Sequence, residues 1–215
     1  LHKVLQCSVV SLHASLHSNE PDPSYHMIGL AESSWISSDA LLINAGRGNL
    51  LTVAAAEMLL LRGVDVVLDT WPDEPNVDPM LLAGVRFGTP HIAGYSQQSK
   101  INATDFLIDA LAASLGLPPS RRDPSRGGLK QVLVLESALS VSQVVTELVA
   151  GVGRLRVDDL NFRRRWSELA TPECFESQRR EYVLRDQLNG LSVQLSEEKS
   201  GLRAMLSALG VSVRH

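Results

Sequence analysis

The chain has little of what would anchor it in a membrane or link it covalently. Its 215 residues include two cysteines, Cys7 and Cys174, which are too far apart in the sequence to make a disulfide framework. No apolar run approaches the roughly 20 residues of a membrane-spanning helix, and the start of the chain lacks the order of a signal peptide. We therefore expect a cytoplasmic protein with no membrane association.

The chain also lacks the basic stripe that a nucleic-acid interface needs. Residues 1–117 carry 5 Lys+Arg against 12 Asp+Glu, a charge of −7, and residues 118–215 carry 15 against 12, a charge of +3. The arginines at 163–165 and 179–180 alternate with acidic residues and are not interleaved with aromatic ones. We interpret them as solvated helix faces and expect no nucleic-acid partner.

The first half of the chain alternates strand and helix patterns. Apolar runs without polar alternation are typical of strands that are buried on both faces of a parallel sheet, and they occur at residues 8–13, 40–45, 64–69 and, more weakly, 85–92. A helix is predicted over 52–63, with Thr52 as its N-cap and Gly63 as its stop. Another is predicted over 97–115, with Ile101, Phe106, Ile108, Leu111 and Leu115 along one face. This alternation predicts the later half of a doubly wound α/β sheet.

A segment rich in Pro, Gly, Ser and Arg, residues 116–128, separates this half from a smaller α/β unit. Strands are predicted over 129–135, 191–196 and 211–213, and helices over 140–152, within 173–190 and over 197–210. We therefore expect one domain at 1–117, including the return helix, a linker at 118–128 and a second domain at 129–215.

Several polar residues follow the predicted strands of the first half: Arg47, Asp69, Glu74 and His91. Parallel strands place their carboxyl ends side by side, where open α/β sheets bind ligands. The planar guanidinium of an arginine binds two oxygens of a carboxylate, and a carboxylate beside a histidine orients the ring for proton transfer. Three of them also have a purely structural explanation: His91 as a loop histidine, Arg47 as a surface arginine and Glu74 as a turn residue.

A metal site is not expected. His13 and His17 are four residues apart, with Cys7 and His26 nearby. Residues 8–13 are predicted to form a strand, in which positions i and i+4 are far apart, and no Cys-x-x-Cys accompanies them.

Longer motifs indicate a particular protein family. The stretch "LLINAGRGNLLTVAAAEMLLLRGVDVVLDTWPDEP", followed by "TPHIAGYS", resembles the D-isomer-specific 2-hydroxyacid dehydrogenases. Tyr95 and Lys100 resemble the pattern of a subfamily that acts on a phosphorylated hydroxyacid. The stretches "FESQRREYVLRDQLNGLSVQL" and "LRAMLSALGVSV" resemble the C-terminal dimerisation domain of that subfamily. The resemblance implies a Rossmann-like sheet, NAD as cofactor, a small phosphorylated hydroxyacid as substrate, and a homodimer through the C-terminal domain.

Residue roles also follow from the resemblance. It implies that Arg47 binds substrate and acts in catalysis, that Glu74 pairs with the histidine, and that His91 donates and accepts the proton. It implies that Tyr95 contacts the substrate. The cofactor would meet Asp69, Gly94 and position 14, where Ala14 replaces a threonine and one hydrogen bond is lost.

Other differences from the family pattern bear on whether residues 1–215 can be active by themselves. Gly46 stands where the family has a small side chain, which predicts a looser turn, and the sequence contains no Gly-x-Gly-x-x-Gly for the cofactor's pyrophosphate. The first residues also predict that the chain opens inside a strand, and the sequence has no initiator Met. We therefore expect that an N-terminal portion is missing and that residues 1–215 alone are inactive. The alternatives are another D-2-hydroxyacid dehydrogenase and a truncated, non-catalytic relative that only dimerises.

Overall fold

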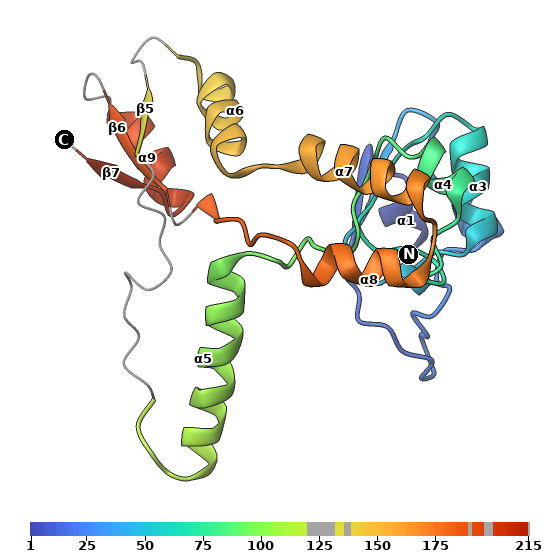
Figure 1. Ribbon diagram of the computed structural model, residues 1–215, viewed down its shortest axis with the longest axis horizontal. Helices are drawn as coiled ribbons and strands as arrows, with labels where there is room; N and C mark the ends of the chain where they lie inside the picture. Colours follow the sequence, from blue (N-terminus) through green and yellow to red (C-terminus); the bar gives the residue numbers. More distant parts are fainter. Residues whose placement is uncertain (120–131, 136–138, 189–190, 196–199, 215) are drawn as a thin grey trace. The chain divides into compact units, whose positions relative to one another are not determined.

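The computed structural model describes residues 1–119, 132–135, 139–188, 191–195 and 200–214 (Figure 1). It contains two compact units, each built from two stretches of chain. Unit 1 consists of Leu1–Ala93 and Leu155–Tyr182, and unit 2 consists of Gly94–Arg154 and Val183–His215. The chain therefore leaves unit 1 after Ala93 and returns to it at Leu155.

Unit 1 is built on a parallel sheet, as the apolar runs predicted. The strands are β1 (Val9–Leu12), β2 (Leu41–Asn44), β3 (Asp65–Leu68) and β4 (Phe87–Gly88), in the order β1-β2-β3-β4. The first three runs are confirmed. The fourth is wrong in length, because strand pairing stops at Gly88, before a proline without an N–H and a histidine with a positive φ. The carboxyl ends of β2, β3 and β4 consequently lie side by side.

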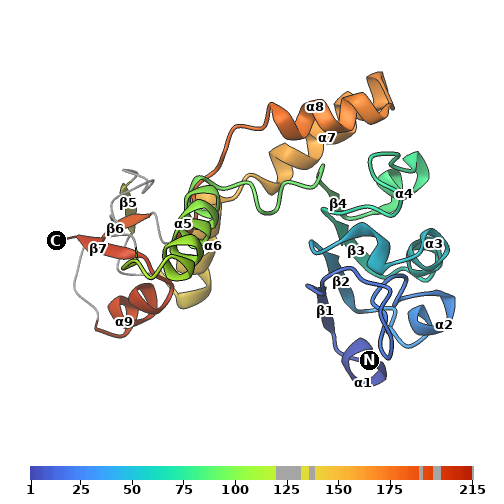
Figure 2. The same ribbon diagram turned by 90° about the horizontal axis from the view of Figure 1, so that it is seen from below.

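Short helices connect these strands, and Figure 2 shows α2, α3 and α4 on one side of the sheet. The α-helices in this part of unit 1 are α1 (His2–Leu5), α2 (Leu30–Ser33), α3 (Val53–Leu61) and α4 (Pro79–Gly84), and residues Gly48–Leu50 form the short 3₁₀ helix η1. The Thr52 hydroxyl accepts from the Ala55 N–H and Gly63 has φ +78°, so the predicted start and stop of α3 are confirmed. The expectation that the chain opens inside a strand is wrong, because its first residues form α1.

Two helices that come much later in the chain complete unit 1: α7 (Leu155–Glu168) and α8 (Pro172–Arg180). Their aromatic side chains Phe162, Trp166 and Phe175 are buried, and the Phe162 ring centroid lies 5.7 Å from that of Trp71. Helix α7 is also fixed by polar bonds, because the Asp159 carboxylate accepts the Gly88 N–H at 2.7 Å. Apolar residues that pack on the first sheet thus explain why α7 and α8 group with unit 1, whereas the sequence pattern grouped them with 129–215.

One charged residue of α7 does not belong to a solvated face as expected. Arg163 donates to the carboxylate of Asp159 at 2.8 Å, to the carbonyl of Val85 at 2.9 Å and to the carbonyl of Leu82. Arg165, by contrast, lies near the surface in an ion pair with Glu181. The charge pattern alone could not separate these two arginines, because two of the three partners of Arg163, the carbonyls of Leu82 and Val85, lie about 80 residues earlier in the sequence.

Unit 2 contains a second parallel sheet, of β5 (Val132–Leu135), β6 (Ser192–Leu195) and β7 (Ser212–Arg214) in that order. Its helices are α5 (Gln97–Ser114), α6 (Val141–Val152) and α9 (Ser200–Ala208). The predicted elements are thereby confirmed within the described residues; the linker at 120–128 and the start of the strand at 129–131 lie outside them. Buried apolar residues form the core: Leu135, Val144, Leu148, Leu191, Val193, Leu206 and Val211.

Helix α5 does not bury the apolar face that its sequence suggested. Phe106 is 68% exposed and Leu111 is 60% exposed. The Ser96 hydroxyl still caps the helix by accepting from the Ser99 N–H at 3.0 Å. Among the described residues, no helix is both long enough and apolar enough for a membrane span.

Candidate active site

The turn after β2 is built around Asn44, a buried residue that the sequence pattern did not single out. The Asn44 side-chain amide donates to the Arg47 carbonyl at 2.9 Å, and its oxygen accepts the Gly46 N–H at 3.2 Å. Its backbone carbonyl accepts the N–H groups of Asp69 and Thr70 after β3, at 3.0 and 3.2 Å. Asn44 therefore fixes the Arg47 turn and ties it to the next segment.

Arg47 itself is exposed at this edge of the sheet, with its Nη1 donating to the Gly46 carbonyl at 2.8 Å. The turn on either side of it leaves no room for side chains. A Cβ at Gly48 would lie 1.7 Å from the Trp71 carbonyl oxygen, and one at Gly46 would lie 2.8 Å from the Leu12 carbonyl oxygen. The expectation that Gly46 loosens the turn is therefore wrong, because close backbone packing requires glycine there.

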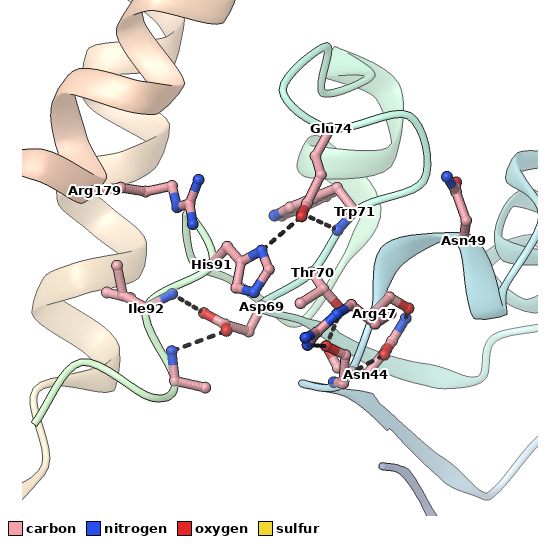
Figure 3. Close-up of polar contacts among 12 residues, drawn as sticks. Asn44, Arg47, Asn49, Asp69, Thr70, Trp71, Glu74, His91, Ile92 and Arg179 are labelled. Carbon is pink, nitrogen blue, oxygen red and sulfur yellow. Dashed lines mark hydrogen bonds and ion pairs between the residues drawn. The ribbon is translucent and has the colours of Figure 1, made fainter. Parts of the chain in front are cut away.

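Asp69 anchors the loop that carries the histidine (Figure 3). Its Oδ1 accepts the Thr89 hydroxyl at 2.6 Å and the Ile92 N–H at 2.8 Å, and its Oδ2 accepts the Ala93 N–H at 2.9 Å. The backbone carbonyl of Asp69 accepts the His91 N–H at 2.7 Å. Burial raises the pKa of the Asp69 carboxyl, although the hydrogen bonds from Thr89, Ala93 and Ile92 oppose this rise.

His91 is held in an unusual backbone conformation. Its φ is +55°, a left-handed value that is uncommon outside glycine. Pro90 precedes it with a fixed φ, and the Trp71 indole N–H donates to the Thr89 carbonyl at 2.8 Å. The loop therefore has little freedom, and the direction of the imidazole is set by its backbone.

The imidazole of His91 contacts Glu74, which is the pairing that the family resemblance implied. His91 Nδ1 lies 2.6 Å from Glu74 Oε1, and both side chains are about one quarter exposed, at 23% and 24%. The other Glu74 oxygen accepts the Trp71 N–H at 3.0 Å, which fixes the carboxylate. Since an ionised carboxylate only accepts, Nδ1 carries the proton of the neutral ring and Nε2 is left as a proton acceptor.

Three predicted site residues remain: Ala14, Gly94 and Tyr95. Ala14 is half-buried against the core of unit 1. Gly94 and Tyr95 belong to unit 2. A Cβ at Gly94 would meet no atom within 4 Å, and the Lys100 ammonium lies 4.1 Å from the centroid of the Tyr95 ring.

Within the described part of the chain, no group of three or more His, Cys, Asp or Glu could hold a metal ion. Of the histidines considered for such a site, His13 lies 2.8 Å from the Ser11 hydroxyl through its Nε2.

The structure adds residues to the site that the sequence pattern missed. Asn44, Thr89 and Trp71 hold the loops in place, and Arg179 of α8 lies on the His91 side of the site (Figure 3). Asn44 ends an apolar run in "LLINAG", which is a usable sequence signal for a strand-end position. Arg179 has no local signal, because only the packing of α8 on unit 1 brings it there.

Fold and geometry together define a class. The chain contains a parallel α/β domain with a histidine–carboxylate pair at the carboxyl ends of its strands, as the resemblance to the D-isomer-specific 2-hydroxyacid dehydrogenases implied. A more particular likeness comes from whole-chain comparison. The chain is 34% identical over 217 residues to an erythronate-4-phosphate dehydrogenase of Stutzerimonas stutzeri, and 33% identical over 223 residues to one of Marinobacter nauticus. It is thus similar to these erythronate-4-phosphate dehydrogenases over nearly the whole of its own length.

The alignments cover nearly all of this chain but only part of each relative. These alignments cover 96% and 100% of this chain but 56% and 57% of the relatives, so the chain spans little more than half of their length. Among solved structures, a D-isomer specific 2-hydroxyacid dehydrogenase from Lactobacillus delbrueckii ssp. bulgaricus, in its NAD complexed form, matches with 29% identity and a TM-score of 0.45. That match covers 55% of this chain and 40% of the other. No family model matches the chain.

The Asp69 anchor gives a stability prediction. Asp69→Asn should lower the free energy of unfolding by about 1–3 kcal/mol, because an amide nitrogen would face a backbone N–H and leave it unsatisfied. The matched change Asp73→Asn, at an exposed position, should alter it by less than about 0.5 kcal/mol. Urea unfolding followed by tryptophan fluorescence measures both.

The same experiment has a pH arm. Because the folded pKa of Asp69 is raised, the folded state takes up this proton at a higher pH than the unfolded state. The deficit of Asp69→Asn should therefore widen as the pH falls through the raised value and level off below the unfolded pKa of about 3.9. Equal losses in the two variants at pH 7 would contradict the anchoring role.

Proposed function

We propose that this chain carries the acid–base and substrate-binding residues of an NAD-dependent 4-phospho-D-erythronate dehydrogenase. The reaction oxidises 4-phospho-D-erythronate to 2-oxo-3-hydroxy-4-phosphobutanoate, as a step in pyridoxal 5′-phosphate biosynthesis. The observation that carries the proposal is the 2.6 Å contact between His91 and Glu74 at the carboxyl ends of β3 and β4. The relatedness to erythronate-4-phosphate dehydrogenases along the chain supports this substrate over other 2-hydroxyacids.

Each residue has a defined task in this proposal. His91 Nε2 accepts the proton of the substrate hydroxyl, and Glu74 stabilises the imidazolium that forms. The exposed guanidinium of Arg47 binds the substrate carboxylate through two oxygens, and Tyr95 adds a substrate contact. NAD, when bound, supplies the hydride acceptor.

The residues fit one end of this cofactor. Gly94 is exposed with open space beside it, so backbone contact with the nicotinamide is sterically possible. Asp69 would act at this end mainly by holding the loop, because both of its carboxylate oxygens already accept hydrogen bonds. Ala14 offers no side-chain hydrogen bond, and the sequence has no glycine-rich motif for the pyrophosphate. We therefore expect residues 1–215 alone to bind NAD weakly and to oxidise 4-phospho-D-erythronate at a negligible rate.

A chimera tests the function directly. In the Stutzerimonas stutzeri relative, the segment that this chain matches would be replaced by residues 1–215. NADH formation from 4-phospho-D-erythronate should then appear, and His91→Asn should lower kcat about 10²- to 10⁴-fold by removing the proton acceptor. Arg47→Lys should also be severely impaired, because an ammonium cannot bind a carboxylate in a bidentate way. A folded chimera without turnover would instead support a non-catalytic, dimerising protein.

The histidine–glutamate pair gives a separate prediction in the same chimera. Glu74→Gln keeps a similar shape but removes the charge that stabilises the imidazolium. Because oxidation requires a neutral His91, the acidic limb of the pH profile of kcat/KM should move to lower pH. An unchanged profile in Glu74→Gln would show that the pair has no part in proton transfer.

We further propose that the chain forms a homodimer through its C-terminal region. Apolar side chains of unit 2 that would suit such an interface are solvent-exposed in the single chain, including Val134 at 71% and Val141 at 64%. Light scattering should give the mass of two chains, about twice 23.4 kDa. A monomer across the micromolar range would refute the dimer.

A further inference from the structure

A second arginine lies on the opposite side of His91 from Arg47. Figure 3 shows the guanidinium of Arg179 extending from α8 toward the His91 imidazole, while Arg47 lies on the side of Asn44 and Thr70. Both α8 and the histidine loop belong to unit 1. The histidine–glutamate pair is therefore flanked by two cations, which come from segments more than 100 residues apart.

The contacts of Arg179 leave part of its binding capacity unused. Its Nη1 donates to both carboxylate oxygens of Glu176, at 3.0 and 3.1 Å, and its guanidinium lies 5.8 Å from the centroid of the Phe175 ring. Its Nε is buried and has no hydrogen-bond partner among the described residues. Glu176 thus holds one corner of the group, and the edge formed by Nε and Nη2 is the edge suited to a bidentate anion.

Two other arginines of unit 1 are not available in this way. Arg62 donates to the carbonyls of Ser33 and Ile36, and Arg163 donates to Asp159 and to two carbonyls at the end of α4. These bonds give both residues a structural task. The side chain of Arg179 remains 23% exposed, the same as that of His91.

We propose that Arg179 binds the phosphate of the phosphorylated hydroxyacid, with Arg47 binding its carboxylate. This inference rests on the proposed function. The substrate carries an anion at each end and the reacting hydroxyl next to the carboxylate. A molecule that spans from Arg47 to Arg179 places that hydroxyl beside His91 and its phosphate on α8. Guanidinium groups bind phosphate oxygens in a bidentate way, which an ammonium cannot reproduce. Arg179 would thus select phosphorylated over unphosphorylated hydroxyacids.

Two ligands and three variants of the 215-residue chain test the inference by calorimetric titration. The ligands are 4-phospho-D-erythronate and D-erythronate, which differ only in the phosphate. Arg179→Gln should weaken binding of the phosphorylated ligand about 10- to 100-fold and leave binding of D-erythronate unchanged. Arg180→Gln, a matched change at an exposed position of α8, should change neither. Arg47→Gln should weaken both ligands, because both carry the carboxylate.

Each other outcome counts against a stated part of the argument. Equal weakening of both ligands by Arg179→Gln would show a structural role of Arg179 and overturn the inference. Unchanged binding of the phosphorylated ligand by Arg179→Gln, with Arg47→Gln impaired, would overturn it while the proposed function stands. No binding of either ligand by the unaltered chain would count against both. Arg179→Lys tests whether the guanidinium binds the phosphate through two hydrogen bonds. If this variant bound 4-phospho-D-erythronate as tightly as the unaltered chain does, bidentate binding would be contradicted.

Discussion

The candidate site depends on one buried carboxylate. Asp69 accepts hydrogen bonds from Thr89, Ile92 and Ala93, so the whole loop after β4 is attached to the end of β3. That attachment holds His91 at a positive φ, which its backbone would not prefer on its own. Burial disfavours the charge of Asp69, and three hydrogen bonds offset that cost only in part, since the net pKa is raised. Fixing the imidazole in this way therefore has a local cost in stability, which is the burial of the Asp69 charge.

The second constraint is backbone proximity between neighbouring loops. Gly48 lets the Arg47 turn lie against the Trp71 carbonyl, and Asn44 bonds to both turns. The Trp71 N–H in turn fixes Glu74. The positions of Arg47, Glu74 and His91 are therefore not independent: each is set by hydrogen bonds between the ends of adjacent parallel strands. A small rearrangement in one loop would displace all three groups, which makes this site sensitive to substitutions that never touch a substrate.

Much of this could be predicted from the sequence, for identifiable reasons. Apolar runs and caps such as Thr52 are local signals, so β1 to β3 and α3 were predicted close to their observed bounds. Strand ends of a parallel sheet meet, so the placement of polar residues there predicted a carboxylate near His91, and the family resemblance implied that it is Glu74. Local sequence signals failed to predict the features that depend on packing between residues far apart in the sequence. Helices α7 and α8 join unit 1 because Phe162 and Phe175 are buried there, and a charge pattern around Arg163 gives no hint of partners about 80 residues away.

That same packing links the two ends of the proposed substrate site. Arg47 comes from a loop of the first sheet, whereas Arg179 comes from a helix that the chain reaches only after building part of unit 2. The distance between the two cations thus depends on how α8 packs within unit 1, and Phe162, Trp166 and Phe175 form the apolar part of that packing. Aromatic packing is directional and close, so it can hold a helix in one position. Discrimination for a phosphate would then be set by a hydrophobic contact that lies away from the phosphate itself.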